Sequence, residues 1–138
     1  MTLHIKIVGA APERKSVGAA GYDLCASKDH TIPVGQIGIV GTGLRIAVPL
    51  GYELQVRARS GMAARGILVA NAPGTVDSDY RGEIGVILIN MSGKISEIKA
   101  GDRVAQAVFA RVEDCVFENV ETLDETSRGS GGFGSTGS

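Results

Sequence analysis

The sequence has few of the side chains that build metal clusters or disulfide frameworks. Its 138 residues include two cysteines, Cys25 and Cys115, and two histidines, His4 and His30. The cysteines lack the spacing of metal ligands, and the histidines stand apart from each other and from the cysteines. We therefore expect two buried free thiols, which suits a reducing compartment.

Net charge and long apolar runs are also scarce. The formal charge is −1 at pH 7, so bulk attraction to nucleic acid is not expected and an anionic ligand would need locally grouped basic residues. No apolar run is long enough to cross a bilayer, and Met1–Val8 already alternates like a strand instead of resembling a secretory leader. The sequence predicts a cytoplasmic protein without nucleic-acid or membrane partners.

Glycine is abundant, at 20 of 138 residues, and separates short apolar runs. Short apolar runs that recur roughly every eight to twelve residues are typical of an all-β sandwich or barrel. A chain of this length with 43% hydrophobic residues is expected to form one domain with a substantial core. Between Ile37 and Arg59 the apolar residues recur at every second position, which predicts strands joined by a turn at Pro49–Gly51.

The stretch Asn71–Glu83 lies between two predicted strands, Ile67–Ala70 and Ile84–Ile89. The second strand is nearly all apolar, so we expect it to be buried on both faces. Within the connection, Asp77–Tyr80 contains two carboxylates and an aromatic ring. Such a turn could hold a general base close to a flat ligand, and a charged, solvent-facing hairpin is the alternative.

Ser60–Gly66 is the only segment that favours a helix, with Ser60 as its N-cap and Gly66 directly after its last turn. Arg57 and Arg59 precede it on one face of a strand. Free N–H groups at a helix start, next to arginines, could bind phosphate. An ordinary capped turn is the alternative.

Two further segments carry polar groups whose role stays open at this point. Gln106 is expected to share a strand face with the apolar residues Val104, Val108, Ala110 and Val112. A buried amide in such a row needs a hydrogen-bond partner, either in the core or in a ligand.

The tail Thr126–Ser138 cannot bury a core, yet its glycines could approach an anion and Phe133 could stack on a planar ring. A flexible Gly/Ser-rich end is the alternative.

Five segments, taken in order, resemble the homotrimeric dUTP diphosphatases (dUTPases). They are Ala20–Leu24, Arg59–Gly61, Asn71–Glu83, Gly101–Gln106 and Arg128–Gly137. Each segment alone is weakly specific, whereas all five in this order on a strand-rich chain are highly specific. The resemblance covers nearly the whole chain.

The resemblance implies a fold, an activity and an assembly. The fold is a jelly-roll-like β-barrel or sandwich with one short helix, formed by residues 1–123, and a flexible tail at 124–138 that closes over the nucleotide. The activity is Mg²⁺-dependent hydrolysis of dUTP to dUMP and pyrophosphate, which keeps uracil out of DNA and supplies dUMP. The assembly is a homotrimer with shared active sites: one chain gives the uracil-binding hairpin, a second the phosphate-binding segments and the third the tail.

The resemblance also implies roles for individual residues. Asp77 matches the general base that deprotonates the water attacking the α-phosphorus, while Asp79 matches no catalytic residue. Tyr80 matches a ring that packs under deoxyribose and leaves no room for a 2′-hydroxyl. Asp23 matches a residue that contacts Mg²⁺ through water, the metal being held mainly by the triphosphate.

The substrate-binding residues implied by the resemblance fall into three groups. For uracil they are Asn71, Gly74, Thr75 and Val76, and Gly85 is a further substrate-binding position without a more specific role. For the phosphates they are Arg59, Ser60, Gly61 and Gln106. In the tail they are Arg128, Phe133, Gly134, Ser135 and Thr136, with the phenylalanine over uracil and the arginine, serine and threonine on the γ-phosphate.

The chain departs from the common family pattern at Ala58, Pro73 and Thr75, none of which removes the implied base. Two alternatives stay open: a dUTP-sensing interaction protein of the same fold, and a dCTP deaminase. The turn Asp77–Tyr80 argues against the deaminase, which needs a differently placed acidic residue. The sensing protein is disfavoured because no inserted loop is evident in 138 residues.

Overall fold

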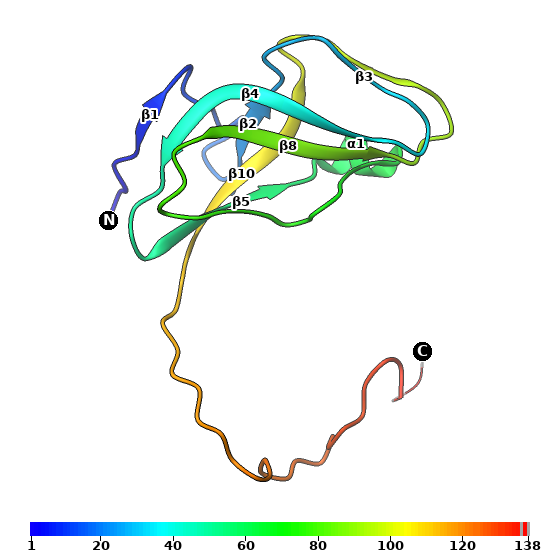
Figure 1. Cartoon of the computed structure of the whole chain (residues 1–138). Helices are drawn as coiled ribbons and strands as arrows, with labels where there is room; N and C mark the ends of the chain where they lie inside the picture. Colours follow the sequence, from blue (N-terminus) through cyan, green and yellow to red (C-terminus); the bar gives the residue numbers. More distant parts are fainter. Residues whose placement is uncertain (136, 138) are drawn as a thin grey trace.

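The computed structural model describes residues 1–135 and 137 as an almost entirely β protein, as the sequence predicted. Figure 1 shows the strands gathered in one body, from which the C-terminal segment extends away. The strands are β1 (Lys6–Val8), β2 (Tyr22–Cys25), β3 (His30–Ile32), β4 (Ile37–Ala47), β5 (Tyr52–Arg57), β6 (Ile67–Val69), β7 (Gly74–Val76), β8 (Glu83–Asn90), β9 (Ser96–Ile98) and β10 (Arg103–Arg111).

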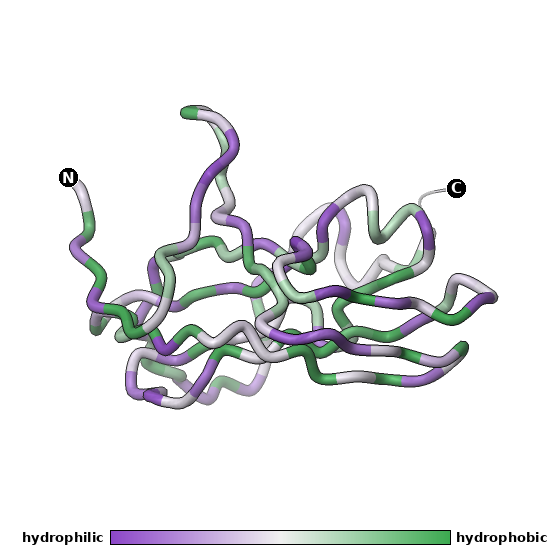
Figure 2. Tube along the Cα trace, turned by 90° about the horizontal axis from the view of Figure 1, so that it is seen from above, coloured by the Kyte–Doolittle hydropathy of each residue, from purple (hydrophilic) through white to green (hydrophobic). Residues whose placement is uncertain are grey.

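Two four-stranded antiparallel sheets, ordered β1-β4-β8-β6 and β2-β10-β5-β7, are accompanied by the β3-β9 pair. Alternation with a period of two turns an apolar face of each sheet toward the core. Figure 2 shows hydrophobic and hydrophilic residues alternating along the chain. Leu24 and Leu54 from one sheet join Val40, Val86 and Leu88 from the other in a single buried core. The sheets therefore pack face to face, as in a sandwich.

The outer face of the β4-β8-β6 sheet is apolar and incompletely covered. We call this the isoleucine face; it consists of Ile37, Ile39, Leu68, Ile87 and Ile89. Ile37 and Ile39 are 59% and 64% exposed. The expectation that residues 84–89 are buried on both faces was wrong for the single chain. Alternate residues of β8 turn to this face and are only half-buried, because no second layer of the described residues covers it.

Asn90, at the end of β8, is the buried polar residue among those described, at 0% exposure. Its side-chain Nδ2 donates to the carbonyls of Ile32 and Lys94, each at 2.8 Å, and its Oδ1 accepts from the N–H of Ser92 at 3.0 Å. Because its donors and acceptor are satisfied, the side chain ties β8 to β3 and to the turn before β9.

The single helix, α1 (Ser60–Ala64), forms where the sequence predicted it. Its N-cap is Arg59, which makes no side-chain capping bond, so the prediction of Ser60 as N-cap was wrong by one residue. Gly66 has φ +90° and follows the C-cap Arg65, as predicted. In the part of the chain that the structure describes, no helix is long and apolar enough to cross a bilayer.

Candidate functional site

Three of the five segments meet at one end of the β2-β10-β5-β7 sheet. Gln106 on the central strand β10 pairs with Asp23 on β2 and with Arg57 on β5, so the three side chains share one face of the sheet. The chain passes from β5 directly into Arg59–Gly61 at the start of α1. We call Asp23, Arg59, Ser60, Gly61 and Gln106 the phosphate-side cluster.

The position of Gln106 differs from the sequence-based expectation. A bulge between Arg103 and Ala105 shifts the alternation, so that the consecutive residues Val104 and Ala105 are both buried and Ala107 continues the core row. Gln106 therefore lies on the outer, half-buried face instead of in a buried apolar row. Its Nε2 donates to the carbonyl of Ala58 at 3.0 Å, which is a hydrogen bond to the strand that leads into α1.

Two arginines link the members of the cluster. The Nη1 of Arg59 donates to the carbonyl of Arg103 at 3.1 Å, and the Nη1 of Arg103 lies 3.7 Å from Oδ2 of Asp23. That carboxylate oxygen is buried and has no hydrogen-bond partner among the described residues, because the arginine is beyond hydrogen-bond distance. Arg103 was part of a recognised segment, but sequence reasoning gave it no role, since only the fold brings it next to Asp23.

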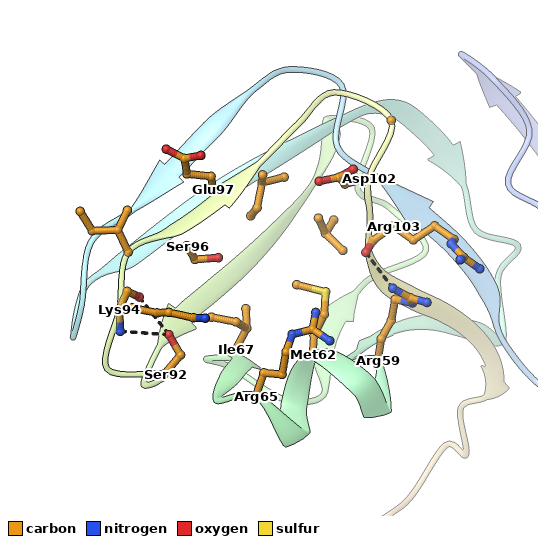
Figure 3. Close-up of a pocket in the computed structure, with 14 residues that line it drawn as sticks. Arg59, Met62, Arg65, Ile67, Ser92, Lys94, Ser96, Glu97, Asp102 and Arg103 are labelled. Carbon is orange, nitrogen blue, oxygen red and sulfur yellow. Dashed lines mark hydrogen bonds between the residues drawn. The ribbon is translucent and has the colours of Figure 1, made fainter.

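A groove of about 720 Å³ runs beside this cluster, between α1 and the β9-β10 segment. Figure 3 shows Arg59 directed at the backbone of Arg103, and Arg65 and Lys94 pointing into the groove. Four basic residues, Arg59, Arg65, Lys94 and Arg103, line the groove together with the carboxylates of Glu97 and Asp102. The chain of net charge −1 thus carries a local group of cations here.

The Asn71–Glu83 connection contains a short strand that the sequence did not predict. The flanking strands β6 and β8 pair with each other as expected, but Gly74–Val76 between them joins β5 of the other sheet as β7. Val76 is buried in the core at 8% exposure, and Gly74 is buried as well. Thr75 is exposed, and the Asn71 amide lies so close to Gly74 that a Cβ there would be 3.3 Å from Nδ2.

The turn after β7 is exposed and internally braced. The N–H of Tyr80 donates to the carbonyl of Asp77 at 3.2 Å, and the Tyr80 hydroxyl donates to the carbonyl of Glu83 at 2.8 Å. Arg45 of β4 fixes the turn from outside, since its Nε donates to the carbonyl of Arg81 at 2.8 Å. Asp77 is exposed, and the Tyr80 ring is 44% exposed.

The single chain separates Asp77 from the phosphate-side cluster. Val76 pairs with Leu54 near the beginning of β5, and Asp77 lines a hollow with Tyr52 and Glu53, whereas Ser60 follows the end of that strand. A strand of six residues spans about 17–20 Å. Within one chain, the carboxylate and the phosphate-side cluster therefore lie at opposite ends of β5.

Gly85 lies apart from both groups. It pairs with Gly41 of β4, and a Cβ built on it would lie 3.1 Å from Cγ2 of Ile39, on the isoleucine face. Because Gly85 has no side chain, the side chain of Ile39 on β4 can pack closely against the backbone of β8.

The tail leaves the body after β10. Arg128 donates from Nε to the carbonyl of Gly131 at 2.8 Å, Gly134 has φ +81°, and the Phe133 ring is fully exposed. Ser135 is exposed as well, and Thr136 lies outside the described residues. The single chain does not bring these residues to either of the other two groups (Figure 1).

Comparison with known proteins gives one consistent family. The sequence model of the dUTPase family matches residues 8–137. The deoxyuridine 5′-triphosphate nucleotidohydrolase of Wolinella succinogenes is 56% identical over 127 residues, which cover 91% of this chain and 85% of the relative. The enzyme of the same name from Zymomonas mobilis is 52% identical over 127 residues, covering 91% and 87%.

Solved structures of dUTPases have the same fold. A variant dUTPase from Staphylococcus bacteriophage 80alpha with dUpNHpp superposes with a TM-score of 0.89 at 20% identity, covering 99% of this chain and 100% of that one. A variant dUTPase from phage phi11 of S. aureus, whose structure details the coordination of a structural Mg(II) ion, gives 0.77 at 20%, covering 88% and 99%. The native EIAV dUTPase gives 0.77 at 28%, covering 88% and 100%. The family model, the relatives and the fold agree, and the chain belongs to the dUTPase family.

Proposed function

We propose that this protein hydrolyses dUTP to dUMP and pyrophosphate. The observation that carries the proposal is the family match over residues 8–137, together with relatives above 50% identity that are named deoxyuridine 5′-triphosphate nucleotidohydrolases. The phosphate-side cluster supports it, because Arg59 and Arg103 concentrate cations where Gln106 and the start of α1 also lie. Donors and cations gathered in this way suit a triphosphate.

The complete active site is formed by more than one copy of the chain. A general base must come within about 3 Å of the water that it deprotonates, and that water must reach the phosphorus. Asp77 and Ser60 stand at opposite ends of β5 in one chain, so the cluster of one copy must meet the Asp77 turn of another. A homotrimer, with the tail supplied by the third copy, satisfies this requirement.

The isoleucine face supports such an assembly. Ile37 pairs with Ile89 and Ile39 with Ile87, so their side chains form one apolar patch across β4 and β8. Exposed contiguous apolar patches are typical of surfaces that bind another protein. A second and third copy of this chain would cover it and complete the burial of β8.

In the assembled site, Asp77 is the general base and takes the proton of the attacking water. Tyr80 forms a wall beneath the deoxyribose, held at its hydroxyl by the carbonyl of Glu83. A rigid wall is required because an apolar pocket alone rejects an added hydroxyl by only about 10²-fold. Backbone groups of Gly74–Val76, with Asn71, read the edge of uracil.

Ser60 and the N–H of Gly61 face the bridge between the α- and β-phosphates, while Arg59 and Gln106 fix the turn that carries them. Donors aimed at charge that develops in the transition state contribute about 10²–10³ in rate each. In the tail, Phe133 covers uracil, and Arg128, Ser135 and Thr136 bind the γ-phosphate. The ordering of this tail costs about 2–5 kcal/mol, so only a full triphosphate closes it effectively.

The residues of the cluster also fit a magnesium ion that is held mainly by the triphosphate. Oδ2 of Asp23 is a buried acceptor without a hydrogen-bond donor, and a water of the Mg²⁺ shell would satisfy it. When bound, Mg²⁺ neutralises charge on the phosphate oxygens. Asp23 would therefore hold the metal's water shell, and its carboxylate lies 3.7 Å from Nη1 of Arg103 at the start of β10. Both cysteines are free in the described chain, but the expectation that they are buried was wrong, because Cys25 is half-buried and Cys115 is exposed. Free thiols suit the proposed cytoplasmic location.

Pyrophosphate release from dUTP, UTP, dCTP and dTTP, measured side by side with Mg²⁺, tests the function. We expect turnover of dUTP alone; deamination of dCTP without pyrophosphate release would instead indicate a deaminase.

Asp77→Asn should lower kcat by about 10²–10⁴-fold with dUTP still bound. Asp79→Asn is the matched control, since this exposed carboxylate lies in the same turn and has no assigned role. Equal activity of both variants would remove Asp77 from the role of base.

A further inference from the structure

Gly21 lies directly beneath the side chain of Gln106. A Cβ built on Gly21 would collide with Oε1 of Gln106 and would lie 3.0 Å from its Cβ and 3.1 Å from its Cδ. These three atoms are the nearest that a side chain at position 21 would meet. Gly21 is not among the glycines with positive φ, so other residues could adopt its backbone conformation. A larger residue is excluded at this position only by its steric clash with the side chain of Gln106.

The Gln106 amide is thus held from two sides. Its oxygen end rests against Gly21, just before β2, and its Nε2 donates to the carbonyl of Ala58 at 3.0 Å, after β5. A side-chain amide with one fixed donor and one close steric neighbour has few other rotamers available. Ala58 immediately precedes Arg59 and the turn into α1, so the orientation of Gln106 is coupled to that turn.

We propose that Gly21 is a positioning residue for triphosphate binding. By leaving the space of a Cβ empty, it lets Gln106 reach Ala58 and thereby fixes the turn at Arg59–Gly61. The inference rests on the proposed function, because it takes the cluster to be the triphosphate site. Gly21 itself touches no substrate and acts through the glutamine.

A double-mutant cycle tests the proposal. The four proteins are the wild type, Gly21→Ala, Gln106→Ala and the double variant, and the readout is the Kd of dUpNHpp in titration calorimetry. The alanine at 21 should displace the amide and break its bond to Ala58, which raises Kd about 10-fold, the equivalent of one hydrogen bond. In the Gln106→Ala background, the same change at 21 should alter Kd less than about 2-fold, since most of the colliding atoms are gone.

Gly18→Ala is the matched control, because nothing lies within 4 Å of a Cβ at that position and its φ is not positive. It should bind dUpNHpp like the wild type. Deoxyuridine, which lacks phosphates, should bind Gly21→Ala and wild type equally; an equal loss for both ligands would indicate a general structural defect and overturn the positioning role. An equal effect of Gly21→Ala in both backgrounds would also overturn it.

Thermal unfolding keeps the proposal testable if Gly21→Ala does not fold. Gln106→Ala in the same chain should then restore a cooperative transition, and an unfolded double variant would overturn the proposal. Failure of the proposed dUTP hydrolysis can be told apart from failure of the Gly21 role. If the hydrolysis proposal is wrong, the wild type releases no pyrophosphate from dUTP, but the effects of Gly21→Ala and Gln106→Ala on Tm are still coupled. Turnover of dUTP without any coupling between the two positions would reject only the role of Gly21.

Discussion

Arg59 donates its guanidinium Nη1 to the backbone carbonyl of Arg103, 44 residues further along the chain, at 3.1 Å. This bond joins the residue before α1 to the first residue of β10. With the Gln106–Ala58 bond it makes the start of α1 and the middle of the β2-β10-β5 sheet one unit. The phosphate-side cluster is therefore held by hydrogen bonds of the chain itself, and such preorganisation lowers the entropy cost of binding a ligand.

If the active sites are shared, two strongly impaired variants should complement each other. Asp77→Asn and Ser60→Ala chains, unfolded and refolded together, should recover about a quarter of the wild-type sites by random mixing in a closed ring. Each recovered site takes its base from one chain and its cluster from the other. Pyrophosphate release measures the recovery. The control mixes Asp77→Asn with a chain that carries both changes; activity there, or none in the first mixture, contradicts shared sites.

Tyr80→Ala should allow UTP as a substrate. Removal of the ring leaves space for a 2′-hydroxyl, and the preference for dUTP over UTP in kcat/KM should fall by about 10²-fold or more, to the level of an apolar pocket. Tyr80→Phe is the control, because it keeps the ring and loses only the bond to Glu83. Unchanged discrimination in the alanine variant would show that another group excludes the hydroxyl.

Deletion of residues 128–138 should lower dUTP turnover steeply and leave the fold intact. The hydrogen bonds that the structure gives to residues 113–135 join them to one another, so the loss of the last segment removes none from the sheets. Tm and oligomeric mass should stay at wild-type values while kcat/KM falls by about 10²-fold. A kcat/KM equal to that of the wild type would show that the tail is a flexible end without a catalytic role.

Ile39→Asp should disrupt the assembly. A carboxylate on the isoleucine face would be desolvated without a partner in the trimer, at a cost of several kcal/mol per copy. Light scattering should show monomers, and dUTP turnover should disappear with the assembly. Val17→Asp is the control, since Val17 is 94% exposed and lies outside the patch. A trimeric Ile39→Asp protein would exclude this face as the contact surface.

Asn90→Leu should destabilise the fold by about 2–4 kcal/mol, because it leaves the carbonyls of Ile32 and Lys94 and the N–H of Ser92 without their side-chain partner. Urea unfolding measures the difference. The fully exposed Asn119→Leu should change stability by less than about 0.5 kcal/mol. A similar loss in both variants would mean that the Asn90 bonds contribute little.

Local patterns predicted much of the fold. The alternation in Ile37–Arg59 gave β4 and β5, and Ser60–Gly66 gave α1, because period and capping residues act over a few positions. The bulge at the start of β10 was invisible, since it depends on how that strand meets β2. It reversed the expected orientation of Gln106.

The candidate site was found by motif resemblance, and its geometry needed the fold. Nothing local to Asp23 indicates Arg103 as its neighbour, and nothing in Gly74–Val76 indicates that this segment pairs with β5. Long-range contacts of this kind set the positions of side chains that sequence periodicity leaves undetermined. The assigned roles of Asp77 and the tail residues, and the boundary at residue 123, stay predictions.

The exposed segment after β10 makes each copy of the protein sensitive to proteolysis. An extended, uncovered backbone is the form that proteases accept, and residues 113–135 offer it before they are covered by a neighbour. A cut there would spare the sheets, so the shortened copy would stay folded and, in the proposed trimer, keep its position among intact neighbours. With the role proposed for the tail, such damage would abolish catalysis while the amount of protein stayed constant.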